Sequence, residues 1–356
     1  MTFKRTTSAI WRAAWWVLAV SLLVFVAGWG AVGSSSARSL TGRSANTSSA
    51  RSSSQSTAST VSVNLGTEPW IGYGPWWIAQ KKGFFTKEGL SVNIVTFQQD
   101  ADRNSALASG RTPFSNIDTG RTVQMVENQH LKIRTLLLLD DSEGADAMIA
   151  NNSIHSIKDL RGKSIAYEQG TTSDLLLHYV LLQAHIPFNA IHSVYIPAAN
   201  AATALVAGKV PVAVTYEPYI SNVLQRHHAA VHVVYSSANV PGLIGDYLTV
   251  NTPFLQTHKD VARRLLRVWN DSMNYWKAHP SDGTAIMAAG VGSTPSALKT
   301  TLRGVKIYTV GQNRQLFSSG VIQKRYLLVG SVLASEGVVK HTVSPGQVID
   351  LSYLPG

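Results

Sequence analysis

The sequence predicts an α/β protein of two lobes, each a mostly parallel sheet flanked by helices. Three observations support this prediction. Short strand-like runs alternate with longer helical runs from Val61 onward, the alternation restarts after residue 152, and two extended segments near residues 141–150 and 244–252 join the two halves. Such alternation is typical of parallel sheets that are covered by helices on both faces.

The first half is expected to alternate four strands with three helices. The run VSVNLGT at 61–67 is the first strand, and PWWIAQKKGFFTKEG at 75–89 is expected to form a single helix that closes at Gly89, because glycine favours helix ends. The remaining segments are strands at 90–97, 112–118 and 131–141 and helices at 101–110 and 120–129.

The second half repeats this alternation and is expected to form lobe 2, residues 146–246. A strand ending at Glu168 leads through a loop into a leucine-rich helix, and similar runs continue to residue 237. After residue 252 the pattern is mainly helical, so lobe 1 is expected to comprise 61–145 plus 247–356. Two halves joined by two crossings predict a cleft at the carboxyl ends of the parallel strands, where ligands usually bind.

The first sixty residues predict export. A basic start, MTFKRTTSAIWR, precedes an apolar run of about twenty residues, which is long for a signal peptide and close to the length that spans a bilayer. Residues 1–37 are therefore expected to be a cleaved signal peptide or a retained membrane anchor. Residues 38–60 are rich in serine and threonine, a composition that predicts a disordered linker.

Charge and cysteine content exclude several classes of protein. The formal net charge is +11, but six of the basic residues lie in the first sixty positions, and no dense basic run follows. We therefore expect no nucleic-acid partner. The chain has no cysteine, which excludes disulfides, thiolate metal sites, cysteine nucleophiles and a lipid-modified N-terminal cysteine.

Four blocks of sequence, in this order, resemble a known family. They are GYGPWWIAQKKGFFTKEGLSVNIV, SALASGRTPFSNID, SIKDLRGKSIAYEQGTTSDLLLHYVL and ALVAGKVPVAVTYEPYI. Together they resemble the solute-binding proteins of ABC importers, in the branch associated with nitrate, taurine and alkanesulfonates and related to binding proteins for the pyrimidine precursor of thiamine. The resemblance extends from about residue 61 to about residue 311.

This resemblance implies a type II periplasmic-binding fold that closes by a hinge over one small solute. The implied partners are an ABC permease and its ATPase, and the implied protein is a monomer outside the cytoplasm that needs no cofactor and catalyses no reaction. Two alternatives stay open: a binding protein for a thiamine pyrimidine precursor, and a membrane-anchored domain that senses a solute for a separate partner.

An aromatic stretch, EPWIGYGPWWIAQKKGFF at residues 68–85, opens the folded part of the chain. Trp76, Trp77 and Phe84 are expected on the buried face of the first helix, Trp77 and Phe84 being two helical turns apart. Trp70 and Tyr73 precede that helix in a glycine-containing loop. The corresponding loop faces the cleft in the family, so these two rings are predicted to contact the ligand.

The start of the leucine-rich helix supplies a second set of candidates. Gln169, Thr171 and Thr172 follow a glycine-containing turn, where free backbone N–H groups and hydroxyls can hold an anion. Ordinary N-capping explains the same residues. The resemblance, in which this loop faces the cleft, favours contact with the ligand.

The remaining candidates are polar residues at strand ends and in the two crossings. Proline after Glu217 presents that carboxylate at the end of a strand, and the ligand-facing role is preferred over a solvated turn. Capping and hinge roles compete for the others. The full set of these candidates is Asn116, Asp118, Thr119, Asp140, Glu217 and Asp246.

Carboxylates outnumber basic residues among these candidates. Several carboxylates repel a purely anionic ligand, so the balance tilts towards a nitrogen-bearing or neutral solute, although N–H groups and hydroxyls alone can hold sulfonate or nitrate. The histidines are scattered, and no metal site is expected. The sequence contains no G-x-S-x-G, H-E-x-x-H or P-loop motif, which argues against an enzyme.

Overall fold

The computed structural model describes residues 60–354. The predicted signal or anchor, and all but the last residue of the predicted linker, lie outside the described residues. Among residues 60–354, no helix combines the length and the apolar character that crossing a membrane requires.

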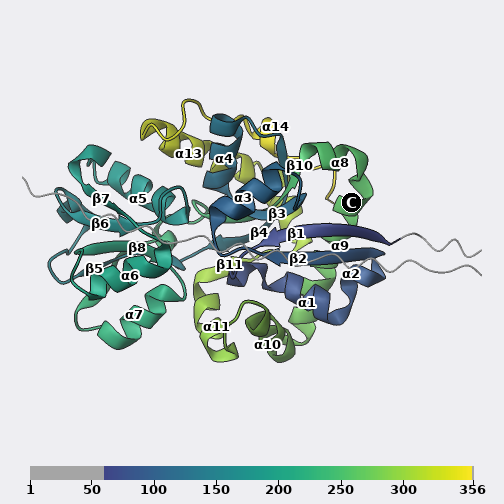
Figure 1. Cartoon of the computed structure of the whole chain (residues 1–356), viewed down its shortest axis with the longest axis horizontal. Coiled ribbons are helices and arrows are strands. Elements are labelled where there is room, and N and C mark those ends of the chain that lie inside the picture. Colours follow the sequence, from purple (N-terminus) through teal and green to yellow (C-terminus); the bar gives the residue numbers. More distant parts are fainter. Residues whose placement is uncertain (1–59, 355–356) are drawn as a thin grey trace, which may run out of the picture. The chain divides into compact units, whose positions relative to one another are not determined.

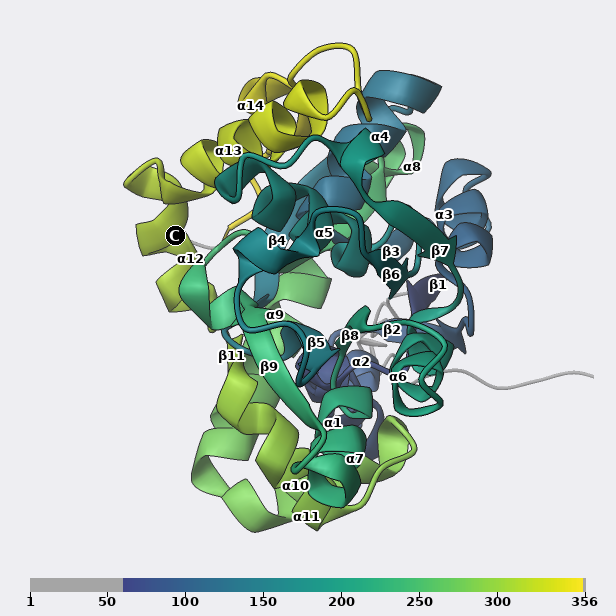
Figure 2. The ribbon, with the colours of Figure 1, turned by 90° about the vertical axis from the view of Figure 1, so that its left-hand side faces the viewer.

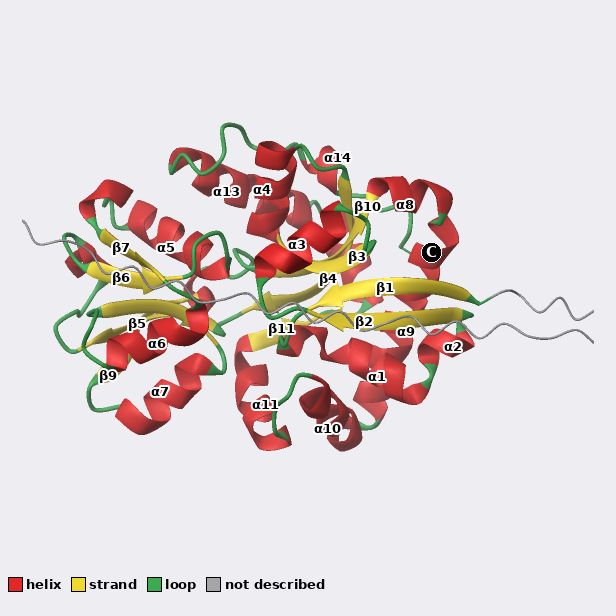
Figure 3. Cartoon of the chain, viewed as in Figure 1, coloured by secondary structure: helices red, strands yellow, loops and turns green. Residues whose placement is uncertain are grey.

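Two sheets carry the fold (Figures 1 and 3). The larger has the strand order β11-β4-β10-β3-β1-β2, and the smaller has the order β7-β6-β8-β5-β9. The strands of the larger sheet are β1 (Val61–Thr67), β2 (Leu90–Thr96), β3 (Phe114–Asp118), β4 (Ile133–Ser142), β10 (Gly245–Asn251) and β11 (Val305–Ile307). Those of the smaller sheet are β5 (Asp146–Asn151), β6 (Ser164–Tyr167), β7 (His192–Tyr195), β8 (Val212–Tyr216) and β9 (Val231–Ser236).

Helices cover both faces of each sheet. One face of the larger sheet carries α1 (Gly74–Lys82), α2 (Phe84–Lys87), α9 (Lys259–Ala278), α10 (Pro280–Gly290) and α11 (Pro295–Thr301). The other carries α3 (Asp100–Ala108), α4 (Thr119–Gln129), α13 (Val321–Ser335) and α14 (Pro345–Val348). Beside these lie α8 (Thr252–Thr257) and α12 (Val310–Ser318). The smaller sheet has α5 (Thr172–Gln183) on one face, with α6 (Ala198–Val206) and α7 (Tyr219–His227) on the other (Figure 2).

Most strands of each sheet run in the same direction, as predicted, and each sheet also contains antiparallel strands. In the larger sheet β1 pairs in parallel with β2 and β3, but β10 is antiparallel to both β3 and β4. In the smaller sheet β6 pairs in parallel with β7 and β8, but β5 is antiparallel to β8 and β9. Of the exceptions, β5 and β10 enter a sheet from a crossing, and the third is the short edge strand β11, which is antiparallel to β4. A chain that arrives at the carboxyl edge of a sheet has to run back against the other strands.

Serine side chains tie the two crossings together. The Ser142 and Ser237 hydroxyl oxygens lie 2.7 Å apart, and the backbone N–H of Gly144 donates to Ser237 Oγ over 2.7 Å. The backbone N–H of Asp146 in turn donates to Ser142 Oγ over 3.0 Å. Buried backbone groups need such partners, so these contacts fix the place where the chain leaves one sheet for the other.

The aromatic stretch forms two helices instead of one. Gly83 has a φ of 73° and ends α1, with its N–H bonded to the carbonyl groups of Ala79 and Gln80. Side chains rarely adopt this left-handed conformation, which explains why glycine stands there. Of the two tryptophans in α1, Trp76 is buried and Trp77 is only partly buried, and Phe84 is also only partly buried. The break at Gly83 puts Phe84 into α2 and changes the phase of the helical pattern.

Trp76 lies at the centre of the core beneath the larger sheet. Its ring centroid lies 4.7 Å from that of Trp269 on α9 and 6.2 Å from that of Phe85. Both tryptophans are almost fully buried. This contact holds α1 against the long helix α9. Helix α1 directly follows the loop of residues 68–73, which we call the aromatic loop.

We expect Trp269→Ala to lower the free energy of unfolding by about 3–5 kcal/mol, the usual cost of a cavity left by a large buried aromatic side chain. Leu327→Ala is the control, because Leu327 is 45% exposed, and a change within about 0.5 kcal/mol is expected there. Urea unfolding measures both values. Equal losses in the two variants would contradict the central position of Trp269.

Candidate functional site

A pocket lies where the strand ends of the two sheets meet. From the larger sheet it is lined by Glu68 and Trp70 after β1, by Phe97 and Asp100 after β2, and by Asp118 at the end of β3. Loops at the carboxyl ends of parallel strands are free to carry ligand-binding side chains because the strands behind them are held by the sheet.

The smaller sheet and the crossings supply the rest of the lining. Glu168, Thr171 and Thr172 follow β6, while Tyr216 and Tyr219 come from the end of β8 and the start of α7. Asp146 is the first residue of the crossing strand β5, and Asp246 is the second residue of the crossing strand β10. Both also line the pocket. The pocket thus draws on both sheets and on both crossings.

Three aspartates stand in register across neighbouring strands of the larger sheet. Asp246 on β10 pairs with Asp118 on β3 and with Asp140 on β4. Like charges directly opposite each other on a sheet are destabilising. Burial raises the pKa of Asp246 well above its usual range, and the Asp140 and Asp118 carboxylates raise it further. Burial likewise raises the pKa values of Asp140 and Asp118.

Asp140 anchors the aromatic loop from behind. It is fully buried, and its Oδ1 accepts a hydrogen bond from the Trp70 indole N–H over 3.0 Å, while Oδ2 has no partner. Gly72 lies against this carboxylate, and a β-carbon at that position would overlap it. The glycine therefore allows the loop to approach Asp140, which in turn fixes the orientation of the Trp70 ring.

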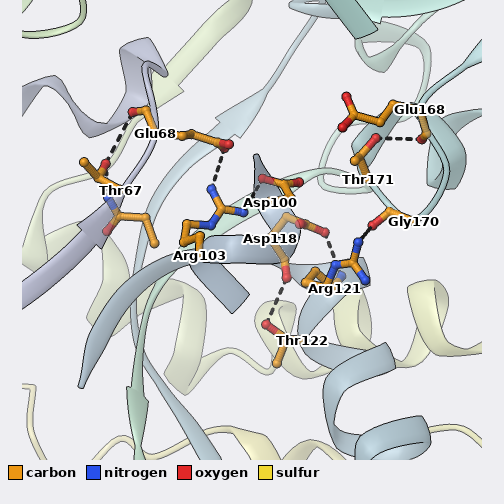
Figure 4. A network of polar contacts seen from close by, with 11 residues as sticks. Thr67, Glu68, Asp100, Arg103, Asp118, Arg121, Thr122, Glu168, Gly170 and Thr171 are labelled. Carbon is orange, nitrogen blue, oxygen red and sulfur yellow. Dashed lines mark hydrogen bonds and ion pairs between the residues drawn. The ribbon is translucent and has the colours of Figure 1, made fainter. Parts of the chain in front are cut away.

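A buried arginine neutralises part of the acidic lining. The Arg103 guanidinium on α3 is 2.7 Å from a Glu68 oxygen and 2.9 Å from an Asp100 oxygen, and its side chain is 1% exposed (Figure 4). Such a charge is tolerated inside a protein only when it is paired. Burial raises the pKa of Glu68 well above its usual range. Burial also opposes ionisation of Asp100, but Arg103 lowers the pKa of Asp100 overall.

A second arginine links the two sides of the pocket. Asp118 caps α4 by accepting a hydrogen bond from the backbone N–H of Arg121 over 2.8 Å. The Arg121 side chain donates to the carbonyl of Gly170, which belongs to the loop after β6 (Figure 4). In the same loop the Thr171 hydroxyl donates to the Glu168 carbonyl over 2.9 Å. These contacts hold the β6–α5 loop against α4.

The carboxylates from the smaller sheet also have protein donors. Glu168 accepts a hydrogen bond from the backbone N–H of Ala198, the first residue of α6, over 2.9 Å. Asp146 accepts one from the Thr172 hydroxyl over 2.7 Å. Burial nevertheless raises the pKa of Asp146 to about 6, because the Ser142 and Thr172 side chains offset only part of the cost of removing the charge from water.

Aromatic rings form one wall of the pocket. The Trp70 and Tyr216 centroids lie 6.1 Å apart in an edge-to-face arrangement, and the Tyr216 and Tyr219 centroids lie 5.5 Å apart. Trp70 comes from the larger sheet and both tyrosines come from the smaller one. The wall therefore spans the two sheets.

Of the residues predicted from the sequence, five line the pocket: Trp70, Asp118, Thr171, Thr172 and Asp246. Asp140 lies behind Trp70. Tyr73 is 1% exposed and packs in the core. The Asn116 side chain bonds to Trp76 and Thr67, and the Thr119 hydroxyl bonds to the Gly245 carbonyl. The side chains of Tyr73, Asn116 and Thr119 are therefore engaged in packing or in hydrogen bonds within the fold, and they do not line the pocket.

Two predicted residues lie elsewhere. Gln169 lines a second pocket, together with Arg121, His178 and Glu336. Glu217 caps α7, with its carboxylate accepting hydrogen bonds from the backbone N–H of Ser221 over 3.1 Å and from the Ser221 hydroxyl over 2.7 Å. The proline after Glu217 starts that helix, so the carboxylate turns towards the helix instead of the pocket.

The predicted set omits Glu68, Asp100, Asp146 and Glu168 among the acids, and Phe97, Tyr216 and Tyr219 among the rings. Glu68 and Asp100 follow strands directly, and that position is a usable signal. The sequence predicts a strand that ends at Glu168, but β6 ends one residue earlier, at Tyr167. Arg103 gave no signal, because its pairing joins segments 35 residues apart and depends on the sheet order.

Comparison with known proteins identifies the family. The NMT1/THI5-like family model matches residues 70–283, more than half of the chain. The chain belongs to this family. Its pocket lies within the matched segment, apart from Glu68 and Pro69.

Similar proteins are named for binding. A Bacillus subtilis protein, provisionally named an aliphatic sulfonates-binding protein, is 26% identical over 58% of this chain, and the match spans 63% of that relative, just under two thirds. The periplasmic aliphatic sulphonate-binding protein SsuA of Escherichia coli superposes with a TM-score of 0.66 at 16% identity, over 81% of this chain and 97% of SsuA.

The same fold also occurs in an enzyme. The desulfurization enzyme DszB superposes with a TM-score of 0.59 at 13% identity, over 83% of this chain and 97% of DszB. These structural likenesses confirm the predicted two-lobed periplasmic-binding fold. A fold of this kind supports both binding and catalysis, so function has to be argued from the pocket.

The buried acids predict that the protein is more stable in mild acid. A folded pKa above the unfolded one gives stability that is complete below the unfolded pKa and is lost as pH rises through the folded value. For Asp146 that window runs from about pH 4 to about pH 6, and Asp140 and Asp246 act in the same direction. Burial lowers the pKa of His178, but Asp174 and Glu336 raise it overall, which again favours acid.

We therefore expect the melting temperature of the ligand-free protein to rise when the pH falls from 7.5 to 5.5, with ~1 kcal/mol from Asp146 alone. Differential scanning calorimetry in buffers of constant ionic strength measures this change. A melting temperature that falls over the same range would contradict the raised pKa values.

Glu217→Ala should lower the free energy of unfolding by about 1 kcal/mol, the usual cost of losing a helix cap. Glu143→Ala is the control, since its ion pair with Lys306 is long and exposed, and such pairs contribute little. Urea unfolding compares the two. If Glu217→Ala were as stable as the control, the capping role would be wrong.

Proposed function

We propose that this protein is the extracytoplasmic solute-binding component of an ABC importer. In this proposal it captures one small polar solute between its lobes and presents the closed form to a permease and its ATPase. The protein acts outside the cytoplasm, after export or under an N-terminal anchor, and as a monomer. It carries out no chemical step.

The observation that carries the proposal is the composition of the pocket wall. Trp70 and Asp118 come from the larger sheet, whereas Tyr216 and Thr172 come from the smaller sheet. A solute that contacts both sides stabilises the form in which the sides are close, because its binding energy depends on their separation. The family membership and the names of the relatives support the same reading.

The crossings provide the hinge in this proposal. Only a few residues separate β4 from β5, and they lie beside the segment that leads back to β10. Short crossing segments absorb rotation while the sheets stay rigid. The expected division is lobe 1 from 61–145 plus 247–356 and lobe 2 from 146–246.

Closure can be measured by fluorescence energy transfer, because a chain without cysteine accepts labels only at introduced cysteines. Ser105→Cys on α3 and Asn200→Cys on α6 are exposed positions on opposite sides of the pocket. Asn200→Cys with Gln225→Cys on α7 is the control pair, since both lie beside the smaller sheet. We expect a bound solute to change transfer in the first pair and to leave the control pair unchanged.

The solutes to be tested are ethanesulfonate, taurine, nitrate, aminopyrimidines and small amines, first by thermal shift. A solute that raises the melting temperature without changing transfer in the first pair would exclude closure. If none of these solutes binds, the solute-binding proposal fails.

A further inference from the structure

The charge of the pocket differs from what the names of the relatives suggest. Six of the residues that line it are acidic, and none of its lining residues is lysine, arginine or histidine. Two arginines lie behind this lining: Arg103 pairs with Glu68 and Asp100, and Arg121 acts on Asp100, Asp118 and Glu168. The acids outnumber these arginines, and this excess favours a positive over a negative solute.

Protein carboxylates accept N–H groups at three helix starts beside the pocket, whereas at the start of α5 Asp174 accepts the N–H of Gly170 and Thr171 forms no side-chain cap. Helix N-termini bind anions through their free N–H groups. Asp118 accepts the N–H of Arg121 in α4, Glu168 accepts that of Ala198 in α6, and Glu217 accepts that of Ser221 in α7. An anionic solute would have to compete with these carboxylates at each of the three helices.

One acid in the pocket has no donor from the protein. Asp246 is 7% exposed and lines the pocket, yet no hydrogen bond or ion pair to its side chain occurs among the described residues. Its neighbours in register are Asp118 and Asp140. The other charged or titratable groups facing it are Glu68, Arg103 and Tyr73. A buried carboxylate among carboxylates needs a positive partner, and the accessible side of Asp246 is the pocket.

The aromatic wall indicates what kind of cation fits. Trp70, Tyr216 and Tyr219 line the same pocket as Asp246, and ring faces attract organic cations as well as apolar groups. A carboxylate without a donor also requires N–H groups on the ligand. Within residues 60–354, no cluster of three acidic or histidine side chains is arranged for a bare metal ion.

We propose that the pocket binds a small organic cation with N–H donors, an ammonium or amidinium compound, whose charged group pairs with Asp246 and whose body packs against Trp70, Tyr216 and Tyr219. This inference rests on the proposed solute-binding function and names its substrate class. It assigns Asp246 as the residue that selects positive over negative solutes.

The first test compares matched probes on the full-length protein by titration calorimetry. Benzamidine and benzylamine are the cations, benzamide and benzyl alcohol are their neutral counterparts, and ethanesulfonate and nitrate are the anions. We expect the cations to bind at least tenfold more tightly than their neutral counterparts, and the anions not to bind.

The second test uses Asp246→Asn, with Asp260→Asn as a control that removes an exposed carboxylate on α9. Asp246→Asn should weaken benzamidine at least tenfold and at the same time raise the melting temperature of the ligand-free protein. Removing a buried charge from between two like charges accounts for the rise. A purely structural role for Asp246 predicts lower stability instead. The control should change neither quantity.

The outcomes separate this inference from the proposed function. Binding of ethanesulfonate or nitrate without binding of the cations would overturn the cation inference and leave solute binding intact. Binding of the cations with the same affinity in Asp246→Asn would overturn the role of Asp246. If no probe of any charge binds, both the inference and the proposed function fail.

Discussion

The rest of this structure depends on the way the chain crosses between its two sheets. Strands β4 and β9 deliver the chain to the carboxyl edges of the sheets, and β5 and β10 leave those edges in the opposite direction. Ser142 and Ser237 hold the two crossings together. Every loop at the carboxyl end of a parallel strand therefore faces the same space, and the pocket follows from this geometry.

The same geometry concentrates acidic residues, and most of them are compensated. Arg103 pairs with two carboxylates, and helix N–H groups hold Asp118 and Glu168. Asp140 and Asp141 are adjacent on β4 and have different partners. Successive residues of a strand point to opposite faces, so Asp140 supports Trp70, while Asp141 forms an ion pair with Arg325 of α13 at 2.8 Å. Asp140 therefore supports the pocket wall, and Asp141 holds α13 in place.

Buried carboxyl groups without a hydrogen-bond donor lower the stability of a fold. Asp140 has one oxygen without a partner, and Asp246 has no partner at all among the described residues. Strained or unsatisfied groups of this kind persist when the surrounding structure over-determines them, and they concentrate at functional sites. The family fold is shared with proteins that are named for sulfonates. The side chains of the pocket, and not the common fold, decide which solutes such a protein can bind.

The sequence alone determined the α/β class, the two-half organisation, the family resemblance and five of the pocket-lining residues. These depend on local signals: alternation of strands and helices, glycines at turns, and polar residues where strands end. It did not determine the environment of each side chain. Glu217 and Asp246 both stand at strand ends in the sequence, yet one caps a helix and the other faces the pocket without a donor. Only the tertiary structure decided between them, because the partners of a buried charge come from strands and helices that are distant in the chain and are brought together by the sheet order.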